Sequence, residues 1–310
     1  MRVLYWGTPA FATPPLRALL GEGFDVVAVV TQPDRPVGRH HHAMRSSPVK
    51  EIALKESVPV LQPEEPRGAE FMAQLRAFQP DLSVVVAYGH ILPADVIALP
   101  ARGTLNIHAS LLPQLRGAAP IETAILEGHA RTGVSIMRMV QRLDAGPVLM
   151  QLETDIPDDE TGGELTLRLS ELGATALIEA LALLEMGEAV ERDQDEAAAS
   201  YARKIERESA RIDWSRDATT VTRAVRAYDP RPGAYSSLDG KDVKLFGARV
   251  AEDAISASGG EVISVANDGM VVACGTGAVR LQQVQPSGQK RMAVGEWLRG
   301  RGVSPGRRFQ

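Results

Sequence analysis

An asparagine and a histidine, Asn106 and His108, lie two residues apart in a short apolar run that begins at Thr104. In a β-strand alternate side chains point to the same face, so these two would project together at the C-terminal end of the strand. An amide can donate a hydrogen bond to a developing oxyanion, and an imidazole exchanges a proton near neutral pH. The pair therefore suits attack on a carbonyl carbon. A buried asparagine beside a histidine that merely packs is the alternative, and the spacing leaves it open.

A carboxylate further along the chain completes a possible set. Asp144 stands in residues 142–147, whose Asp-x-Gly pattern predicts a tight turn before a strand at 148–152. If Asp144 reaches His108, it can fix the tautomer of the imidazole and stabilise its protonated form. A solvated turn residue without such a partner is the other interpretation.

Short apolar runs that alternate with helical patterns predict the scaffold of the first half. Strands are expected at 3–6, 25–30, 82–87 and 104–107, and helices at 9–20, 48–57 and 70–78. Thr8 is expected to cap the first helix and Pro9 to open it. This alternation predicts an α/β fold with a mainly parallel sheet. Because such sheets bind ligands at the carboxyl ends of their strands, Asn106 and His108 are expected at that edge.

The second half has a different pattern. A long helix is expected at 164–185, followed by a stretch rich in charge and alanine. One helix at 218–227 then precedes five short strand-like runs, at 234–238, 243–246, 260–266, 269–273 and 279–284. Their spacing by glycines and turns predicts a small β-barrel. The domains are therefore expected at 1–189 and 206–310, with a linker at 190–205.

Charge divides the chain in the same way. Residues 204–310 hold 17 Lys and Arg against 12 Asp and Glu, a net +5, whereas the remaining residues hold 17 against 27, a net −10. The basic part suits a partner rich in phosphates, although a solvated basic face has the same composition. The single cysteine, Cys274, excludes an intramolecular disulfide and a multi-cysteine metal site. Without a signal-peptide pattern or an apolar stretch of about 18 residues, a cytoplasmic protein is expected.

Several motifs, in order along the chain, resemble those of the folate-dependent formyltransferase family. The central ones are Asn106-x-His108 with Ser110-Leu111-Leu112-Pro113, then Arg116-Gly117-Ala118-Ala119-Pro120, then Leu143-Asp144-x-Gly146. Shorter shared segments lie at 7–11, 31–39, 47–50, 85–89 and 212–214. The resemblance covers residues 3 to about 215 and continues more weakly through the basic part.

This resemblance implies a Rossmann-like catalytic domain followed by an oligonucleotide-binding-type β-barrel. It implies 10-formyltetrahydrofolate as the formyl donor, without a metal, and a catalytic set made of Asn106, His108 and Asp144. The folate-binding residues that it implies are Tyr88, Gly89, Ile91, Leu92, Ser110, Leu111, Leu112 and Pro113.

Residues 34–47 resemble the insertion with which members of this family sense the end of a tRNA acceptor stem. Together with the basic barrel, the insertion favours methionyl-initiator tRNA as the acceptor of the formyl group, in a monomeric enzyme of translation initiation. Where relatives carry lysines after Arg39, this chain has His40, His41 and His42, for which a solvated loop is expected. The cations expected to contact tRNA phosphates are Arg35, Arg39, Arg45, Arg223, Arg226, Lys241, Lys244, Lys290 and Arg291.

Other functions stay open at this point. A formyltransferase of the same fold that acts on an amino sugar nucleotide or glycinamide ribonucleotide would share the catalytic set but would not need the insertion. A dinucleotide-dependent oxidoreductase would need Gly-x-Gly-x-x-Gly after the first strand, where Gly7-Thr8-Pro9 stands. A pure RNA-binding protein would explain the basic barrel and leave the catalytic set without a purpose.

Overall fold

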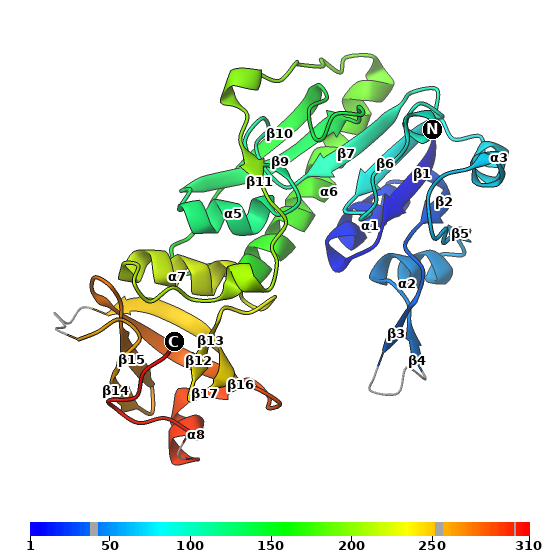
Figure 1. Cartoon of the computed structure of the whole chain (residues 1–310). Coiled ribbons are helices and arrows are strands. Elements are labelled where there is room, and N and C mark those ends of the chain that lie inside the picture. The colour runs from blue at the N-terminus through cyan, green and yellow to red at the C-terminus, as the bar shows by residue number, and fades with distance from the viewer. Residues whose placement is uncertain (38–42, 252–256, 301) are drawn as a thin grey trace. The chain divides into compact units, whose positions relative to one another are not determined.

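The computed structural model describes residues 1–37, 43–251, 257–300 and 302–310 (Figure 1). Packing divides the chain into two compact units, each made of three stretches of sequence. The first unit comprises Met1–Gly117, Thr132–Thr154 and Thr166–Ala202, and the second comprises Ala118–Arg131, Asp155–Leu165 and Arg203–Gln310. The limits 1–189, 190–205 and 206–310 stay a prediction about domains.

A seven-stranded sheet, in the order β10-β9-β7-β6-β1-β2-β5, forms the centre of the first unit. The five strands from β7 to β5 pair in parallel, and β9 runs antiparallel to β7. The α/β fold with a mainly parallel sheet is thus confirmed. The strands are β1 (Arg2–Gly7), β2 (Asp25–Val30), β5 (Val60–Leu61), β6 (Leu82–Val86), β7 (Thr104–His108), β9 (Arg131–Arg138) and β10 (Val148–Asp155).

Helices cover both faces of this sheet, which is why its strands are apolar almost without interruption. On one face, Leu4 and Trp6 of β1 pack in a cluster with Phe71 of α3 and Val96 of α4. On the other face, the Tyr5 hydroxyl donates to the carbonyl of Ala12, at the start of α1, at 2.5 Å. The helices are α1 (Thr13–Gly21), α2 (Pro48–Lys55), α3 (Ala69–Ala77), α4 (Ala94–Ile97) and α6 (Gly162–Met186), with the 3₁₀ helix η1 (Ala10–Ala12) before α1.

Helix starts follow local side-chain chemistry in one case and tertiary contacts in another. The long α6 begins with a capping box, in which Thr161 and Glu164 bond each other's backbone N–H groups at 3.3 and 2.9 Å. The predicted cap of the first helix is wrong, because α1 begins at Thr13 and not beside Thr8. The Thr8 hydroxyl instead donates to the carbonyl of Tyr88, 80 residues away in sequence, at 3.0 Å.

Two short pairings complete the first unit. β3 (Arg35–Val37) and β4 (Ala43–Arg45) form an antiparallel hairpin within the predicted tRNA-sensing insertion (Figure 1). β8 (Arg116–Gly117) pairs in parallel with β11 (Tyr201–Ala202), after the 3₁₀ helix η2 (Glu196–Ala198). The stretch that leads to β11 was predicted as linker.

The sheet of the second unit is antiparallel, in the order β12-β13-β16-β15-β14, with β17 beside β16. Near the end of the chain, the backbone of Arg308 forms an antiparallel β-bridge with Glu261, just before β14. The backbone of Phe309 forms another with Leu238 of β12. These bridges join the two edges of the sheet and close it into the predicted barrel. The strands are β12 (Tyr235–Leu238), β13 (Lys241–Ala251), β14 (Val262–Ala266), β15 (Gly269–Ala273), β16 (Ala278–Pro286) and β17 (Met292–Ala293).

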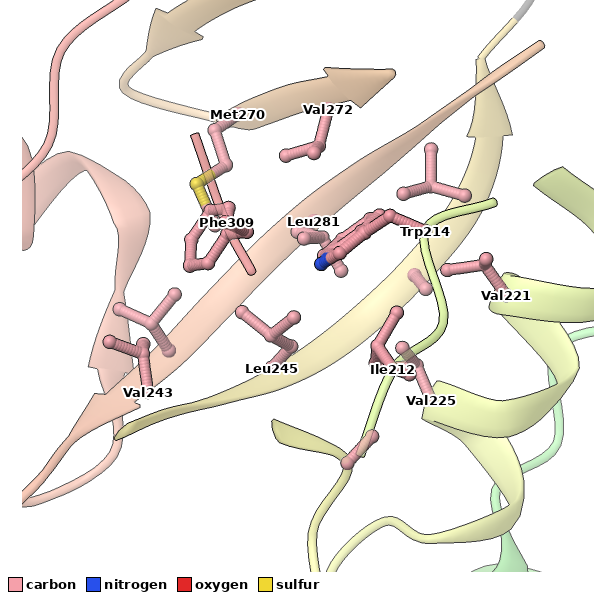
Figure 2. Packing of buried hydrophobic residues seen from close by; sticks show 14 of the residues in the cluster. Ile212, Trp214, Val221, Val225, Val243, Leu245, Met270, Val272, Leu281 and Phe309 are labelled. Carbon is pink, nitrogen blue, oxygen red and sulfur yellow. The ribbon is translucent and has the colours of Figure 1, made fainter. Parts of the chain in front are cut away.

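Trp214 and Phe309 lie at the centre of the barrel core, with their ring centroids 5.7 Å apart (Figure 2). Val221 and Val225 of α7 pack against the same cluster, and so does Leu126 of α5. The core of the second unit therefore draws on a segment that precedes most of the barrel by about a hundred residues. The remaining helices are α5 (Pro120–Glu127), η3 (Glu208–Ala210), α7 (Ala218–Ala227) and α8 (Val294–Arg299).

Candidate active site

The carboxyl edge of the parallel sheet holds the predicted pair Asn106 and His108 at the end of β7. Ile107 between them contacts Gly173 of α6, so the two polar side chains point to the opposite face of the sheet. Asn106 is partly exposed, whereas the side chain of His108 is 6% exposed. The spacing argument for a common face therefore holds, and both residues lie where open α/β sheets bind ligands.

The imidazole of His108 is held between two oxygen acceptors. Its Nε2 lies 2.9 Å from the carbonyl oxygen of Leu115, which can only accept, so Nε2 carries a proton. Its Nδ1 lies 3.7 Å from Oδ2 of Asp144, which is beyond a hydrogen bond but within ion-pair distance. Nε2 thus anchors the ring, and Nδ1 is the nitrogen free to exchange a proton. The structure brings the three predicted catalytic residues into one region.

Asp144 reaches this position through an unusual turn. Its φ of 47° is left-handed, and its Oδ2 accepts a hydrogen bond from the backbone N–H of Gly117 at 2.8 Å. Leu115 and Ala87, at φ 56° and 46°, share this conformation. These three are half of the six non-glycine residues with positive φ in the described chain, and each costs roughly 1–3 kcal/mol. Such strain concentrates at functional sites, which supports a site at this edge.

The loop after β7, which contains the predicted folate-binding residues 110–113, is anchored to the sheet by Ser135 of β9. The Ser135 hydroxyl donates to the carbonyl of Ser110 at 2.7 Å and accepts from the N–H of Leu112 at 3.0 Å. Gln151 of β10 donates to the carbonyl of Leu112 at 2.9 Å. No sequence pattern pointed to Ser135 or Gln151, because they approach the loop from other strands.

The loop after β6 carries the other predicted folate-binding residues. Tyr88 and Leu92 are buried in the cluster around Trp6, and burial raises the pKa of Tyr88 to about 12. Ile91, between them in sequence, is 88% exposed. Gly89 has φ 94°, a left-handed conformation that favours glycine, and a β-carbon there would displace the amide of Gln32, whose nitrogen would lie 2.5 Å away. The loop is therefore anchored by the buried side chains of Tyr88 and Leu92, and it exposes the apolar side chain of Ile91 to solvent.

The β3–β4 hairpin places two of the predicted tRNA contacts opposite each other. Arg35 and Arg45 are exposed cross-strand partners, and Arg35 also donates to the amide oxygen of Gln32 at 2.5 Å. The base of the hairpin is fixed by Lys50, whose ammonium lies 2.6 Å from the carboxylate of Asp34. Arg39 and the three histidines His40, His41 and His42 lie outside the described residues.

The predicted cations of the second unit fall into two groups. Lys241 and Lys290 are exposed. Arg291 is bound bidentately to Asp229, at 2.6 and 3.0 Å, and lies over the ring of Phe246. The side chains of the other three contact neighbouring backbone. Lys244 donates to the carbonyl of Pro232, and Arg226 donates to the carbonyls of Pro157 and Glu160. The guanidinium of Arg223 packs over Gly128. Burial lowers the pKa of Arg226.

Within the described residues, no group of three or more His, Cys, Asp or Glu side chains could hold a metal ion. Cys274 is buried, and burial raises the pKa of its thiol to about 12. None of the described helices combines the length and the apolar character that crossing a bilayer requires.

Comparison with known proteins assigns the class of this site. Residues 1–181 match the family described as formyl transferase, and residues 204–302 match the formyl transferase C-terminal domain. The chain therefore belongs to the formyl transferase family and is an enzyme of that type. It is 48% identical to the methionyl-tRNA formyltransferase of Magnetococcus marinus, over 99% of this chain and 98% of that protein. It is 45% identical to the protein of the same name from Pseudomonas putida, over 97% and 96% of the two chains.

Solved structures share the fold at lower identity. The methionyl-tRNA formyltransferase from Clostridium thermocellum is 14% identical with a TM-score of 0.60, over 83% of this chain and 97% of that one. HypX from Aquifex aeolicus in complex with tetrahydrofolic acid is 22% identical with a TM-score of 0.67, over 96% of this chain and 47% of that one. An N-formyltransferase from Helicobacter canadensis, bound to folinic acid and dTDP-3-aminofucose, is 15% identical with a TM-score of 0.67, over 92% and 98% of the two chains.

Proposed function

We propose that this chain transfers the formyl group of 10-formyltetrahydrofolate to the α-amino group of methionyl-initiator tRNA. The main support for this proposal is the arrangement of His108 at the carboxyl edge of the sheet. Its Nε2 bonds Leu115, its Nδ1 faces Asp144, and Asn106 lies beside it. The chain is 48% identical to a methionyl-tRNA formyltransferase over nearly the full length of both proteins. This similarity supports methionyl-tRNA, rather than an amino sugar nucleotide, as the acceptor. The enzyme acts as a cytoplasmic monomer, with a catalytic domain at 1–189, a linker at 190–205 and a tRNA-binding domain at 206–310.

The first half of the reaction places negative charge where the site has donors. The neutral amine of the methionyl ester attacks the formyl carbon on N10 of the folate, and a new C–N bond forms. The formyl oxygen becomes an oxyanion, which the Asn106 amide and an N–H of protonated His108 stabilise. Loss of one such donor typically costs about 10²–10³ in turnover.

The second half returns the proton. Protonated His108 gives its Nδ1 proton to N10, and the bond between N10 and the formyl carbon breaks. The neutral Nδ1 then accepts the proton that the attacking nitrogen loses, which restores the imidazolium. Asp144 stabilises the imidazolium during this transfer and keeps the ring oriented. The electrons of the broken bond remain on N10, so formylmethionyl-tRNA and tetrahydrofolate leave without a covalent enzyme intermediate. The leaving group is an aryl amine, so no metal is needed.

The two loops beside His108 are suited to a folate. Ile91 offers an apolar surface on which a flat heterocycle can stack, since its side chain is 88% exposed although the neighbouring Leu92 is buried. The backbone of Ser110–Pro113 is held by Ser135 and Gln151, so the loop is fixed in one conformation before a ligand binds. Residues 88–92 and 110–113 bind the donor in this proposal.

The hairpin is suited to a phosphate. Like charges directly opposite on paired strands destabilise a hairpin, yet Arg35 and Arg45 occupy such a pair. A phosphate between or beside them removes that repulsion, which supports these two residues as contacts of the tRNA acceptor stem. Lys241 and Lys290 are the corresponding contacts in the second unit, because both are exposed.

A direct assay tests the proposed reaction. The purified chain, supplied with 10-formyltetrahydrofolate and charged initiator tRNA, is expected to produce formylmethionine, measured by mass spectrometry after hydrolysis of the ester. Activity is expected to survive exhaustive chelation. Formylation of a dTDP-amino sugar or of glycinamide ribonucleotide, with none of methionyl-tRNA, would instead establish the alternative acceptor.

The salt dependence of tRNA binding separates phosphate contacts from structural arginines. Affinity is expected to fall linearly with salt on logarithmic axes, and Lys241→Gln is expected to reduce that slope by about 0.7–1 because one phosphate contact is lost. Arg291→Gln is expected to leave the slope nearly unchanged and to lower thermal stability, since Arg291 is paired with Asp229. A flat salt response of the unmodified chain would refute the phosphate contacts altogether.

A further inference from the structure

Gln194 links the predicted linker to the turn that carries Asp144. Its side-chain nitrogen Nε2 donates to the backbone carbonyl of Asp144 at 2.9 Å and to that of Gly146 at 2.7 Å. Gln194 is partly buried, although its neighbours Asp193 and Asp195 are exposed. One amide group therefore bonds both carbonyls of the strained turn.

The orientation of this amide is fixed from its other end. Oε1 of Gln194 accepts from Nε and Nη2 of Arg116, at 3.0 and 2.8 Å. The Arg116 side chain is completely buried, and its remaining bonds go to the carboxylate of Glu196, at 3.0 and 3.1 Å. Because a guanidinium can only donate and a carbonyl can only accept, the reversed amide would lose all four contacts. Gln194 therefore has one working orientation.

The turn needs a donor at this place. The carbonyls of Asp144 and Gly146 converge on one point, where they would repel each other without a shared N–H donor. The turn packs closely on Arg138 at Gly146, where only glycine fits, because a β-carbon there would lie 1.9 Å from the carbonyl oxygen of Arg138. On the far side of the same residue, the Asp144 carboxylate bonds the N–H of Gly117 and faces Nδ1 of His108. The two bonds of Gln194 thus act on the backbone whose side chain serves the imidazole.

We propose that Gln194 is a positioning residue, which holds the 142–146 turn so that the Asp144 carboxylate stays within reach of Nδ1 of His108. The inference rests on the proposed function, because it assigns Gln194 to the same reaction. Gln194 touches no substrate in this assignment and acts only through Asp144. The proposed linker at 190–205 then also supports the catalytic residues, through Gln194.

The isosteric variant Gln194→Glu tests the donor role. A carboxylate keeps the shape of the side chain and can still accept from Arg116, but it cannot donate to the two carbonyls and repels them. We expect kcat for formylation to fall about 10–100-fold, since a displacement of about 1 Å in a catalytic group can cost 10²-fold. KM for the folate and for the tRNA is expected to change less than about twofold. Gln74→Glu, the same change at an exposed position of α3, is the matched control and keeps its kcat.

A neutral variant, Gln194→Met, covers the case in which the added charge prevents folding. It loses the donor without a carboxylate, and the same fall in kcat at unchanged KM is expected. Unchanged kcat in a folded Gln194→Glu protein would overturn the inference, and so would loss of the folded state in both variants, since Gln194 would then serve folding. An unmodified chain with no formylation activity would refute the proposed function itself.

Discussion

Replacing His108 with alanine is expected to lower kcat for formyl transfer about 10²–10³-fold while the affinity for the folate stays nearly the same. In the proposed mechanism the imidazole supplies both a donor to the oxyanion and the nitrogen that moves the proton, whereas the loops at 88–92 and 110–113 bind the folate. The side chain bonds Leu115 at 2.9 Å, two residues beyond the 110–113 stretch, which Ser135 and Gln151 hold independently of His108. Single-turnover kinetics with folate binding by fluorescence measures the two effects separately.

His129 offers a matched control for this substitution. It lies in the second unit and bonds Glu127 at 3.1 Å, so His129→Ala is expected to retain kcat. A His108→Ala enzyme with most of its turnover would remove His108 from the mechanism. A large rise in the dissociation constant of the folate at unchanged kcat would move His108 to the binding site.

Replacing Trp214 with alanine is expected to lower the free energy of unfolding of the barrel by about 3–5 kcal/mol, the usual range for a buried tryptophan. Trp214 is 5% exposed, packs against Phe309, and donates from its indole N–H to the hydroxyl of Ser236 at 2.9 Å. The variant leaves both a cavity and a buried hydroxyl with one partner fewer. Denaturation in urea, followed by circular dichroism, measures the loss.

Val250 gives the comparison for this stability measurement. It lies on β13 and is 50% exposed, so Val250→Thr, which keeps the β-branched shape, is expected to change the free energy of unfolding by less than about 0.5 kcal/mol. Equal losses in the two variants would show that the Trp214 ring contributes no more than a surface residue, contrary to the packing in Figure 2.

The sequence predicted well those elements whose signals are local. The buried strands at 25–30 and 104–107 and the helix at 218–227 were visible as apolar runs or stripes, and they occur within one residue of the predicted limits. Thr8 shows where this reasoning fails. A threonine before a proline is typical of a helix start. The Thr8 hydroxyl, however, donates to the carbonyl of Tyr88, which is distant in sequence, and a rule based on neighbouring residues cannot anticipate that partner.

The same distinction holds at the site. Asn106 and His108 were predictable because strand alternation relates them, and the family motif supplied Asp144. Gln194 meets Asp144 across 50 residues of sequence, and Arg116 meets Glu196 across 80. Neither contact has a periodicity or a motif, so charge and alanine content alone indicated a linker. The backbone conformation of the site could not be predicted either, since nothing in the amino-acid sequence required Leu115 or Asp144 to adopt a left-handed backbone.

Synthesis on the ribosome gives a further meaning to the shared core of the second unit. The apolar side of α5 is translated about 100 residues before α7, with which it packs. At about 5–20 residues per second, Leu126 and its neighbours wait some 5–20 s for that partner. During this interval Leu126 lacks the apolar side chains of α7 that cover it in the finished chain, and chaperones bind such exposed apolar surface.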